Sequence, residues 1–221
     1  MVTSPRTLFI AGATGAVGRT VVRWATARGA DFVPHVRPKT AAQGKAMHPR
    51  AAVLELADRA ALVDALRDRT TVLQLIGTMR SRFTRGDTYE ISDIGTTRQL
   101  VEAAKQSGSI DHLILLSSVG AGRPFGAYLR AKARAEAIVL ESGIPFTVFR
   151  PSAFMGEGHR VPGVFKTVTR AIGAKSWEPI AVDDLAAALL SVAEGREPLN
   201  TTLEGAALWE LVASSAVTGR G

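Results

Sequence analysis

Three glycines spaced three residues apart constrain the fold of this chain more than any other feature of its sequence. Gly12, Gly15 and Gly18 follow directly on an apolar run at residues 7–11, and a helical pattern follows Gly18. In such a strand–loop–helix unit, one glycine permits a tight turn, another lets the backbone approach a phosphate, and the last lets the helix pack on the strand. The free N–H groups of the first helical turn then face an anion. The spacing predicts a dinucleotide pyrophosphate site; the alternative is a glycine-rich turn that holds no ligand.

Short apolar runs alternate with amphipathic segments along the rest of the chain. Strands are predicted at residues 7–11, 31–36, 52–56, 71–76, 112–117 and 146–150, and helices at residues 16–28, 40–47, 59–67, 89–107 and 127–142. This alternation predicts a parallel sheet with helices on both faces. After residue 150 the pattern weakens. Helices are predicted at residues 164–172 and 183–193, and residues 202–221 are expected to pack back on the body.

The predicted fold class is therefore α/β: a doubly wound parallel sheet in three αβα layers, with a small C-terminal helical extension. We assign all 221 residues to one dinucleotide-binding domain, in which residues 151–221 form a reduced region on the substrate side. A chain of this length buries roughly 70% of its unfolded surface, so it needs no disulfide or metal to hold its core.

Two basic residues follow the second predicted strand. Proteins that bind NAD usually carry an acid about 20 residues beyond the glycine loop, where it holds the ribose hydroxyls. This chain has Arg37 and Lys39 there. A guanidinium matches a 2′-phosphate in charge and geometry, which favours NADP over NAD. The alternative is that Arg37 caps a solvated strand end.

A serine, a tyrosine and a lysine are spaced for carbonyl–alcohol redox chemistry. Tyr128 and Lys132 are four residues apart in a predicted helix, so they share one face. Ser117 and Ser118 end a predicted strand, at the sheet edge where ligands bind. A phenol beside an ammonium can donate or accept a proton, and a serine hydroxyl can hold a substrate oxygen. The alternatives are a tyrosine that packs on the helix surface and serines that hydrogen-bond the strand end.

Taken together, these motifs resemble the short-chain dehydrogenase/reductase superfamily, and within it the atypical, NmrA-like and NAD(P)H-binding branch with its Rossmann fold. They occur in the family's order and cover about three quarters of the chain. The matching segments are residues 12–18, 36–38, 93–97, 115–121, 128–132 with Glu136, and 147–152 with Gly156.

The resemblance implies cofactor contacts for twelve residues: Gly12, Thr14, Gly15, Ala16, Val17, Gly18, Arg37, Gly77, Thr78, Lys132, Pro151 and Ser152. The glycine loop would hold the pyrophosphate, and Arg37 would meet the adenosine phosphate. Lys132 would bind the nicotinamide ribose. Glu55 falls where the family often has an acid near the adenine, although the usual Gly-Asp is absent.

The resemblance also implies catalytic roles. Tyr128 would be the catalytic acid/base, Lys132 its basic neighbour, and Ser118 or Ser117 its partner. Many members carry an asparagine in the long helix that completes a proton relay. In this chain Asp93 and the residues after it occupy that region, which puts the relay in doubt.

The predicted function is that of an NADP-dependent oxidoreductase that moves a hydride between NADP(H) and a small carbonyl or alcohol substrate. The alternative is a non-catalytic NADP(H)-binding regulator or redox sensor. The substrate is expected to be a small molecule, possibly an anionic one, because three arginines follow the fourth strand: Arg80, Arg82 and Arg85. A solvated loop explains those arginines equally well.

Composition excludes several other classes. There is no cysteine, so disulfides and thiolate chemistry are absent, and a reducing cytoplasm suits the chain. The longest uncharged stretch is twelve residues, 7–18, against about 20 for a membrane span. The four histidines lie in different elements, so we expect no metal site. The net charge of +7 favours anionic partners, but with 6% aromatic residues and no reader motif, nucleic acid is not expected. The helices at residues 89–107 and 127–142 could form a homodimer interface.

Overall fold

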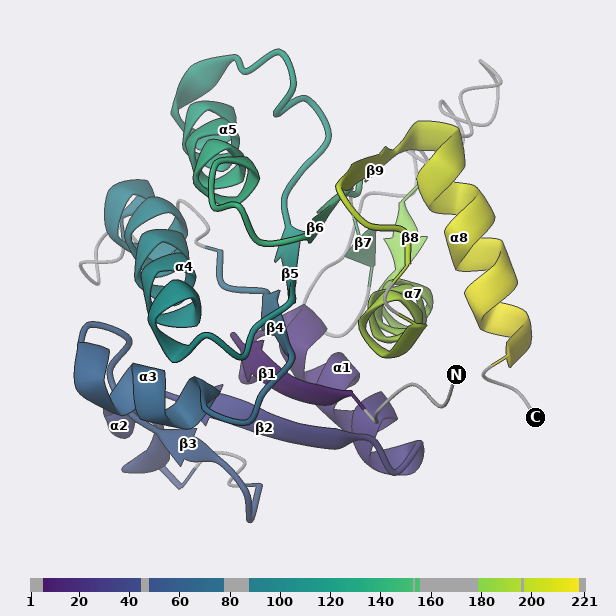
Figure 1. Ribbon diagram of the computed structural model, residues 1–221. Coiled ribbons are helices and arrows are strands. Elements are labelled where there is room, and N and C mark those ends of the chain that lie inside the picture. The colour runs from purple at the N-terminus through teal and green to yellow at the C-terminus, as the bar shows by residue number, and fades with distance from the viewer. Residues whose placement is uncertain are drawn as a thin grey trace.

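A seven-stranded parallel sheet forms the centre of the protein (Figure 1). The computed structural model describes residues 6–44, 48–77, 88–152, 154–155, 179–195 and 197–218. The sheet has the order β3-β2-β1-β4-β5-β6-β9. Its strands are β1 (Thr7–Ala11), β2 (Asp31–Val36), β3 (Ala52–Val53), β4 (Thr71–Gln74), β5 (His112–Leu116), β6 (Phe146–Arg150) and β9 (Thr201–Glu204). The strand order reverses between β1 and β4, and in sheets of this type ligands bind beyond the carboxyl ends of the strands at that point.

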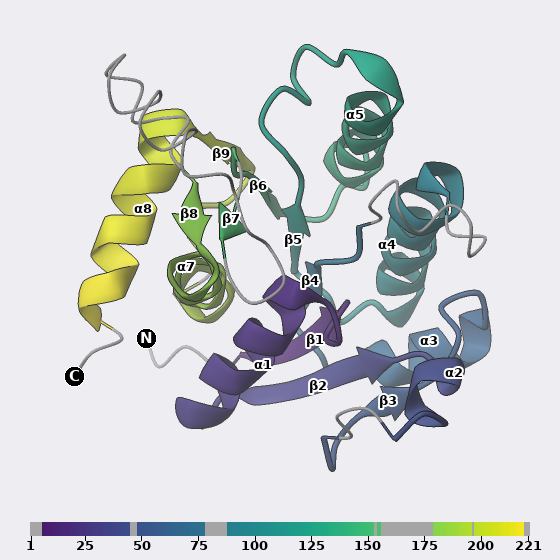
Figure 2. The same cartoon turned by 180° about the vertical axis from the view of Figure 1, so that it is seen from behind.

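Helices cover both faces of the sheet (Figures 1 and 2). One layer contains α3 (Arg59–Leu66), α4 (Thr96–Ser107) and α5 (Gly126–Leu140). The other contains α1 (Ala16–Ala27), α7 (Val182–Gly195) and α8 (Gly205–Thr218). The short helix α2 (Pro38–Ala41) follows β2, and β7 (Phe154–Met155) pairs with β8 (Ile180–Ala181) in a separate two-stranded sheet. The predicted three-layer αβα fold is confirmed.

The central strands are buried on both faces, which explains their unbroken apolar runs. In β1, Leu8 and Ile10 pack into the core under α1 and α7, whereas Phe9 and Ala11 pack into the core under α3 and α4. The same alternation runs through β5. Because successive side chains of a strand point to opposite faces, a strand that buries both sides is apolar along most of its length, and its buried polar residues, such as His112, are hydrogen-bonded.

The predicted elements differ from the observed ones mainly at the edges of the sheet. The third strand was predicted at residues 52–56 and is the two-residue β3, and the helix predicted at residues 40–47 is α2, which ends at Ala41. The helix predicted at residues 164–172 lies outside the described residues. Of the segment 202–221, the described residues 202–218 do pack back, but they begin within a strand, β9, that pairs with β6. β9 contains two threonines and a single buried leucine, so it does not have the apolar run that is typical of a central strand.

The long helix predicted at residues 89–107 begins with a π-helix, η2 (Glu90–Gly95), and continues as α4. The Thr97 hydroxyl donates to the carbonyl oxygen of Asp93 at 2.6 Å, and the Thr96 hydroxyl donates to that of Ser92. Threonine hydroxyls that bond the preceding turn in this way bend helices, and single π-turns occur frequently at functional sites. This turn presents Asp93 to the inside of the protein.

None of the helices among the described residues is both long and apolar enough to cross a membrane. Within the same residues, no group of three or more histidine, aspartate or glutamate side chains is arranged to hold a metal ion.

Candidate functional site

The glycine loop has the geometry that its spacing predicts. Gly12 has φ +91°, and a Cβ placed there would lie 2.8 Å from the backbone of Leu75 at the end of β4. The Gly15 N–H donates to the carbonyl oxygen of Gly12 at 2.9 Å, which closes the turn. A Cβ on Gly18 would lie 2.0 Å from that same oxygen. Gly12 and Gly18 therefore permit close backbone approaches that a side chain would prevent.

The loop delivers the N-terminus of α1 to a cavity of about 470 Å³. Gly15 is the N-cap residue, and Gly12, Thr14 and Gly15 line the cavity. Val17 points into the core instead, so its contribution to a ligand is limited to the backbone N–H. The first N–H groups of a helix have no partner within it, which makes this end of the cavity suited to an anion.

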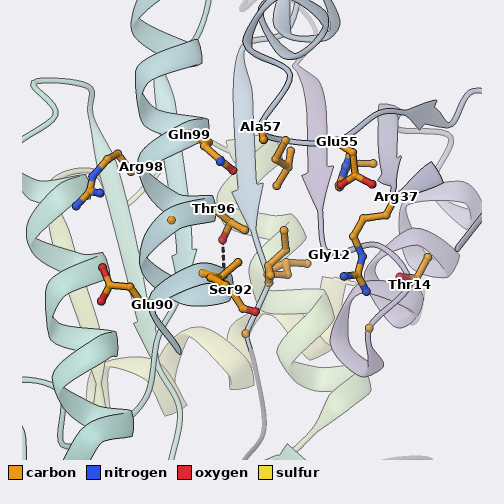
Figure 3. A pocket seen from close by; sticks show the side chains of 18 residues that line it. Gly12, Thr14, Arg37, Glu55, Ala57, Glu90, Ser92, Thr96, Arg98 and Gln99 are labelled. Atoms are coloured by element: carbon orange, nitrogen blue, oxygen red, sulfur yellow. Dashed lines mark hydrogen bonds between the residues drawn. The ribbon is translucent and has the colours of Figure 1, made fainter. Parts of the chain in front are cut away.

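The walls of the cavity come from the carboxyl ends of β2 and β4, the segment after β3, and the η2–α4 segment (Figure 3). Arg37 extends from the β2 side toward Thr14, with Glu55 beside it, while Ser92, Thr96 and Gln99 face them across the cavity. The residues that complete the lining are His35, Leu56, Ala57, Leu75, Ile76, Gly77, Glu90, Ile91, Gly95 and Arg98. A cradle of backbone N–H groups, a guanidinium and an apolar slot fits a dinucleotide whose phosphates lie on the loop.

His35 is a buried histidine in the wall of this cavity. It is 3% exposed, and its Nε2–H donates to the carbonyl oxygen of Leu54 at 2.9 Å. Burial lowers the pKa of His35 below the usual value of 6.5, and the field of Arg37 adds to the effect; the hydrogen bond and Glu55 oppose it. The His35 imidazole is therefore neutral at a pH at which an exposed histidine begins to take up a proton.

This burial predicts a loss of stability on acidification. The unfolded chain binds a proton at His35 near pH 6.5, whereas the folded protein binds it only at lower pH, so the free energy of unfolding falls as the pH drops below 6.5. Urea unfolding of His35→Gln at pH 7.5 and pH 5.5 should show a smaller acid-induced loss than the parent protein. His48→Gln, at a partly exposed position, is the control and should keep the parent's loss. Equal losses in the parent and His35→Gln would contradict this assignment.

Tyr128 and Lys132 come together on α5, as their spacing predicts. The Lys132 ammonium lies 6.0 Å from the centroid of the Tyr128 ring, and the ring of Tyr89 packs on the same tyrosine at 5.6 Å between centroids. Tyr128 is 38% exposed, whereas Lys132 is 5% exposed. Tyr128 is thus partly accessible to solvent, whereas the ammonium of Lys132 beside its ring is buried.

The Lys132 ammonium is also close to the cavity. It lies 2.9 Å from Oδ1 of Asp93 and donates to the carbonyl oxygen of Leu116 at 3.2 Å. A Cβ on Gly77, which lines the cavity, would lie 3.1 Å from Nζ of Lys132. The missing side chain of Gly77 thus leaves room between the cavity and the lysine. Thr78, its predicted neighbour in the site, lies outside the described residues, as do Arg80, Arg82 and Arg85.

The two serines after β5 differ in their surroundings. The Ser117 hydroxyl is buried and donates to Oε1 of Glu136, whereas Ser118 is half-buried. Glu136 is held in turn by Arg150, whose guanidinium donates to it at 2.6 and 3.0 Å and to Glu204 of β9 at 2.9 Å. The bonds to Glu136 raise the pKa of Arg150 above its usual value, although burial opposes this. Ser117 thus belongs to a buried network that ties α5, β6 and β9 together.

Pro151 and Ser152 follow β6 at the same edge of the sheet. The carbonyl oxygen of Pro151 accepts a hydrogen bond from the N–H of Val119 at 3.0 Å, so the two loops lie side by side. Sequence reasoning missed two features of this region. Glu136 entered only as part of a motif, and Asp93 only as a departure from the relay asparagine. The ion pairs of Glu136 with Arg150 and of Asp93 with Lys132 do not join residues at a helical or strand spacing, so no sequence pattern could reveal them.

Comparison with known proteins agrees with this geometry. A family model described as NAD(P)H-binding matches residues 12–195. The protein named "Protein FMP52, mitochondrial" from Candida albicans is 27% identical over 172 residues, which are 75% of this chain and 74% of that protein. The divinyl chlorophyllide a 8-vinyl-reductase, chloroplastic, from Cucumis sativus is 24% identical over 163 residues, or 66% of this chain and 38% of the reductase.

Two solved structures have the same fold. MoeE5 in complex with UDP-glucose and NAD superposes with a TM-score of 0.66 at 20% identity, over 96% of this chain and 81% of MoeE5. The NADPH-dependent quinone oxidoreductase QOR2 from Escherichia coli, complexed with NADPH, superposes with a TM-score of 0.64 at 19% identity, over 96% of this chain and 75% of QOR2. One neighbour carries NAD and the other NADPH, so the shared fold is compatible with either cofactor.

Proposed function

Because this chain belongs to the NAD(P)H-binding family, as its motifs indicate, we propose that it is an NADP-dependent oxidoreductase acting on a small carbonyl or alcohol. One observation carries the proposal. The cavity is lined by the glycine loop, Arg37 and Gly77, and the buried Lys132 lies next to that glycine with Tyr128 beside it. A cofactor bound there would have its adenosine phosphate at Arg37, its pyrophosphate on the glycine loop and its nicotinamide near a proton donor.

The preference for NADP rests on Arg37. This exposed residue is the N-cap of α2 and lines the cavity near the N-terminus of α1. A guanidinium there can bond a 2′-phosphate with two parallel N–H groups. Glu55 lies beside it, so the wall also holds a carboxylate, but that carboxylate follows β3 rather than β2. The position after β2, where an acid selects NAD, carries the arginine.

The catalytic part of the proposal assigns one task to each side chain. The bound nicotinamide supplies or accepts the hydride. Tyr128 donates its phenolic proton to a carbonyl oxygen, or takes one from an alcohol, and the ammonium of Lys132 favours the phenolate. Ser118 holds the substrate oxygen, because the Ser117 hydroxyl is bonded to Glu136. Pro151 and Ser152 border the same space from the neighbouring loop.

Replacing Arg37 should change cofactor preference. We expect Arg37→Ser to weaken NADPH binding by about tenfold to a hundredfold, which is the range for a lost hydrogen bond to a charged group, and to leave NADH affinity nearly unchanged. The two Kd values are measured by nicotinamide fluorescence titration. Lys39→Ser is the matched control, because Lys39 is also exposed and basic but does not line the cavity. Equal weakening of NADPH and NADH would contradict the role of Arg37.

A turnover assay separates the enzyme from a regulator. Purified protein with NADPH is offered a panel of small aldehydes, ketones and quinones, and absorbance at the reduced nicotinamide band is followed. Oxidation of NADPH that depends on a substrate supports the enzyme. Firm NADPH binding with no turnover on any member of the panel favours the non-catalytic sensor.

A further inference from the structure

We propose that Asp93 is a positioning residue, which holds the ammonium of Lys132 where a bound cofactor's nicotinamide ribose can reach it. The inference rests on the cofactor part of the proposed function and concerns how this chain builds that half of its site.

The contact between the two side chains is short and buried. Oδ1 of Asp93 lies 2.9 Å from Nζ of Lys132, and the residues are 1% and 5% exposed. Breaking a buried ion pair by removing one partner is costly, because the remaining charge is left uncompensated in a medium of low dielectric constant. Without the carboxylate, Lys132 would keep the carbonyl oxygen of Leu116 as its described partner, 3.2 Å away. The ammonium would then be free to turn toward water.

The π-helix accounts for the position of Asp93. Asp93 lies within the wide π-turn η2, and the hydroxyls of Thr96 and Thr97 donate to the carbonyl oxygens of Ser92 and Asp93. The same turn is fixed to α5 by a second, exposed ion pair, in which Arg134 donates to Glu90 at 2.8 Å. One buried and one exposed ion pair therefore join η2 to α5, the helix that carries Tyr128 and Lys132.

Among the described contacts, the ammonium keeps a donor hydrogen for a ligand. Of its three donor hydrogens, the carbonyl oxygen of Leu116 accepts one, and the carboxylate of Asp93 lies 2.9 Å from Nζ as its ion-pair partner. Gly77 itself places no side chain on this side, where a Cβ would come within 3.1 Å of Nζ and 3.5 Å of Oδ1 of Asp93. A ribose hydroxyl entering from the cavity would meet a remaining donor of the ammonium. Asp93 thus acts on the cofactor through Lys132.

The test compares the binding of the whole cofactor with the binding of its adenosine half alone. Binding of NADPH and of 2′,5′-ADP, which lacks the nicotinamide ribose, is measured by calorimetry for the parent, Asp93→Asn, Lys132→Met and the double variant. We expect Asp93→Asn to weaken NADPH about tenfold and to change 2′,5′-ADP affinity less than about twofold. In the Lys132→Met background, Asp93→Asn should add less than about twofold, because its effect passes through the lysine.

Several results would overturn the proposal. Equal weakening of both ligands by Asp93→Asn would mean that the aspartate only maintains the fold, and additive effects in the double variant would mean that it acts without Lys132. Glu102→Gln is the control, because it removes the exposed ion pair between Glu102 on α4 and Arg59 on α3 and should leave both affinities unchanged. If Asp93→Asn does not fold, Asp93→Ser is measured in the same way.

The outcome for the parent protein separates this inference from the proposed function. A parent that binds neither NADPH nor NADH overturns both. A parent that binds NADPH tightly while Asp93→Asn binds it equally well overturns the role of Asp93 alone.

Discussion

Replacing Tyr128 by phenylalanine is expected to lower kcat by about 10²–10⁴-fold, which is the usual contribution of a positioned proton donor. The substitution removes one oxygen and keeps the ring, so the packing on Tyr89 and the approach of Lys132 should persist. NADPH affinity should stay within about threefold of the parent's, because the proposed phosphate and adenosine contacts come from residues that line the cavity, and Tyr128 is not one of these residues. Steady-state kinetics and a fluorescence titration on the same preparation measure the two effects.

The chain contains its own control for this experiment. Tyr89 is the only other tyrosine, and its ring packs against Tyr128. Tyr89→Phe removes the same oxygen from the neighbouring ring and should keep kcat within about threefold of the parent's. Full turnover by Tyr128→Phe, or an equal loss in both variants, would exclude Tyr128 as the proton donor.

Gly18→Ala is expected to destabilise the protein by about 3 kcal/mol or more and to abolish cofactor binding. The added methyl group would lie 2.0 Å from the carbonyl oxygen of Gly12 and 2.8 Å from Cα of Ala13. Both obstacles are backbone, so α1 must move away from the loop to relieve the clash. That movement displaces the N–H groups at the start of α1 from the phosphate site.

Gly195→Ala is the matched control for this change. Gly195 ends α7, has no atom within 4 Å of a built Cβ, and has no positive φ, so the substitution should alter the free energy of unfolding by less than about 0.5 kcal/mol. Urea unfolding of both variants measures the difference. A Gly18→Ala protein as stable as Gly195→Ala would show that the helix does not depend on this close approach.

The sequence predicted those features of the fold that local physics determines. The glycine loop, the doubly buried strands and the Tyr128–Lys132 spacing each follow from a short-range requirement of turn, strand or helix. β9 was missed because an edge strand needs no continuous apolar run, and Thr201–Glu204 buries only Leu203. Its pairing with β6 is decided by tertiary contacts.

The second half of the site depends on long-range contacts that no pattern reveals. Asp93 meets Lys132 only because the η2 turn is widened and α5 packs against it. Ser117 and Ser118 are adjacent and chemically identical, and the buried Glu136 distinguishes them. In both cases the partner lies far along the chain, so residue type and spacing were insufficient to predict the contact.

The most direct test of the account is a titration of the purified parent protein with NADPH and, separately, with NADH, followed by nicotinamide fluorescence and by the shift in Tm. We expect both cofactors to bind and NADPH to bind at least about tenfold more tightly, because the guanidinium of Arg37 in the cavity wall can bond a 2′-phosphate. Binding of neither cofactor, or tighter binding of NADH, would contradict an NADP-dependent oxidoreductase.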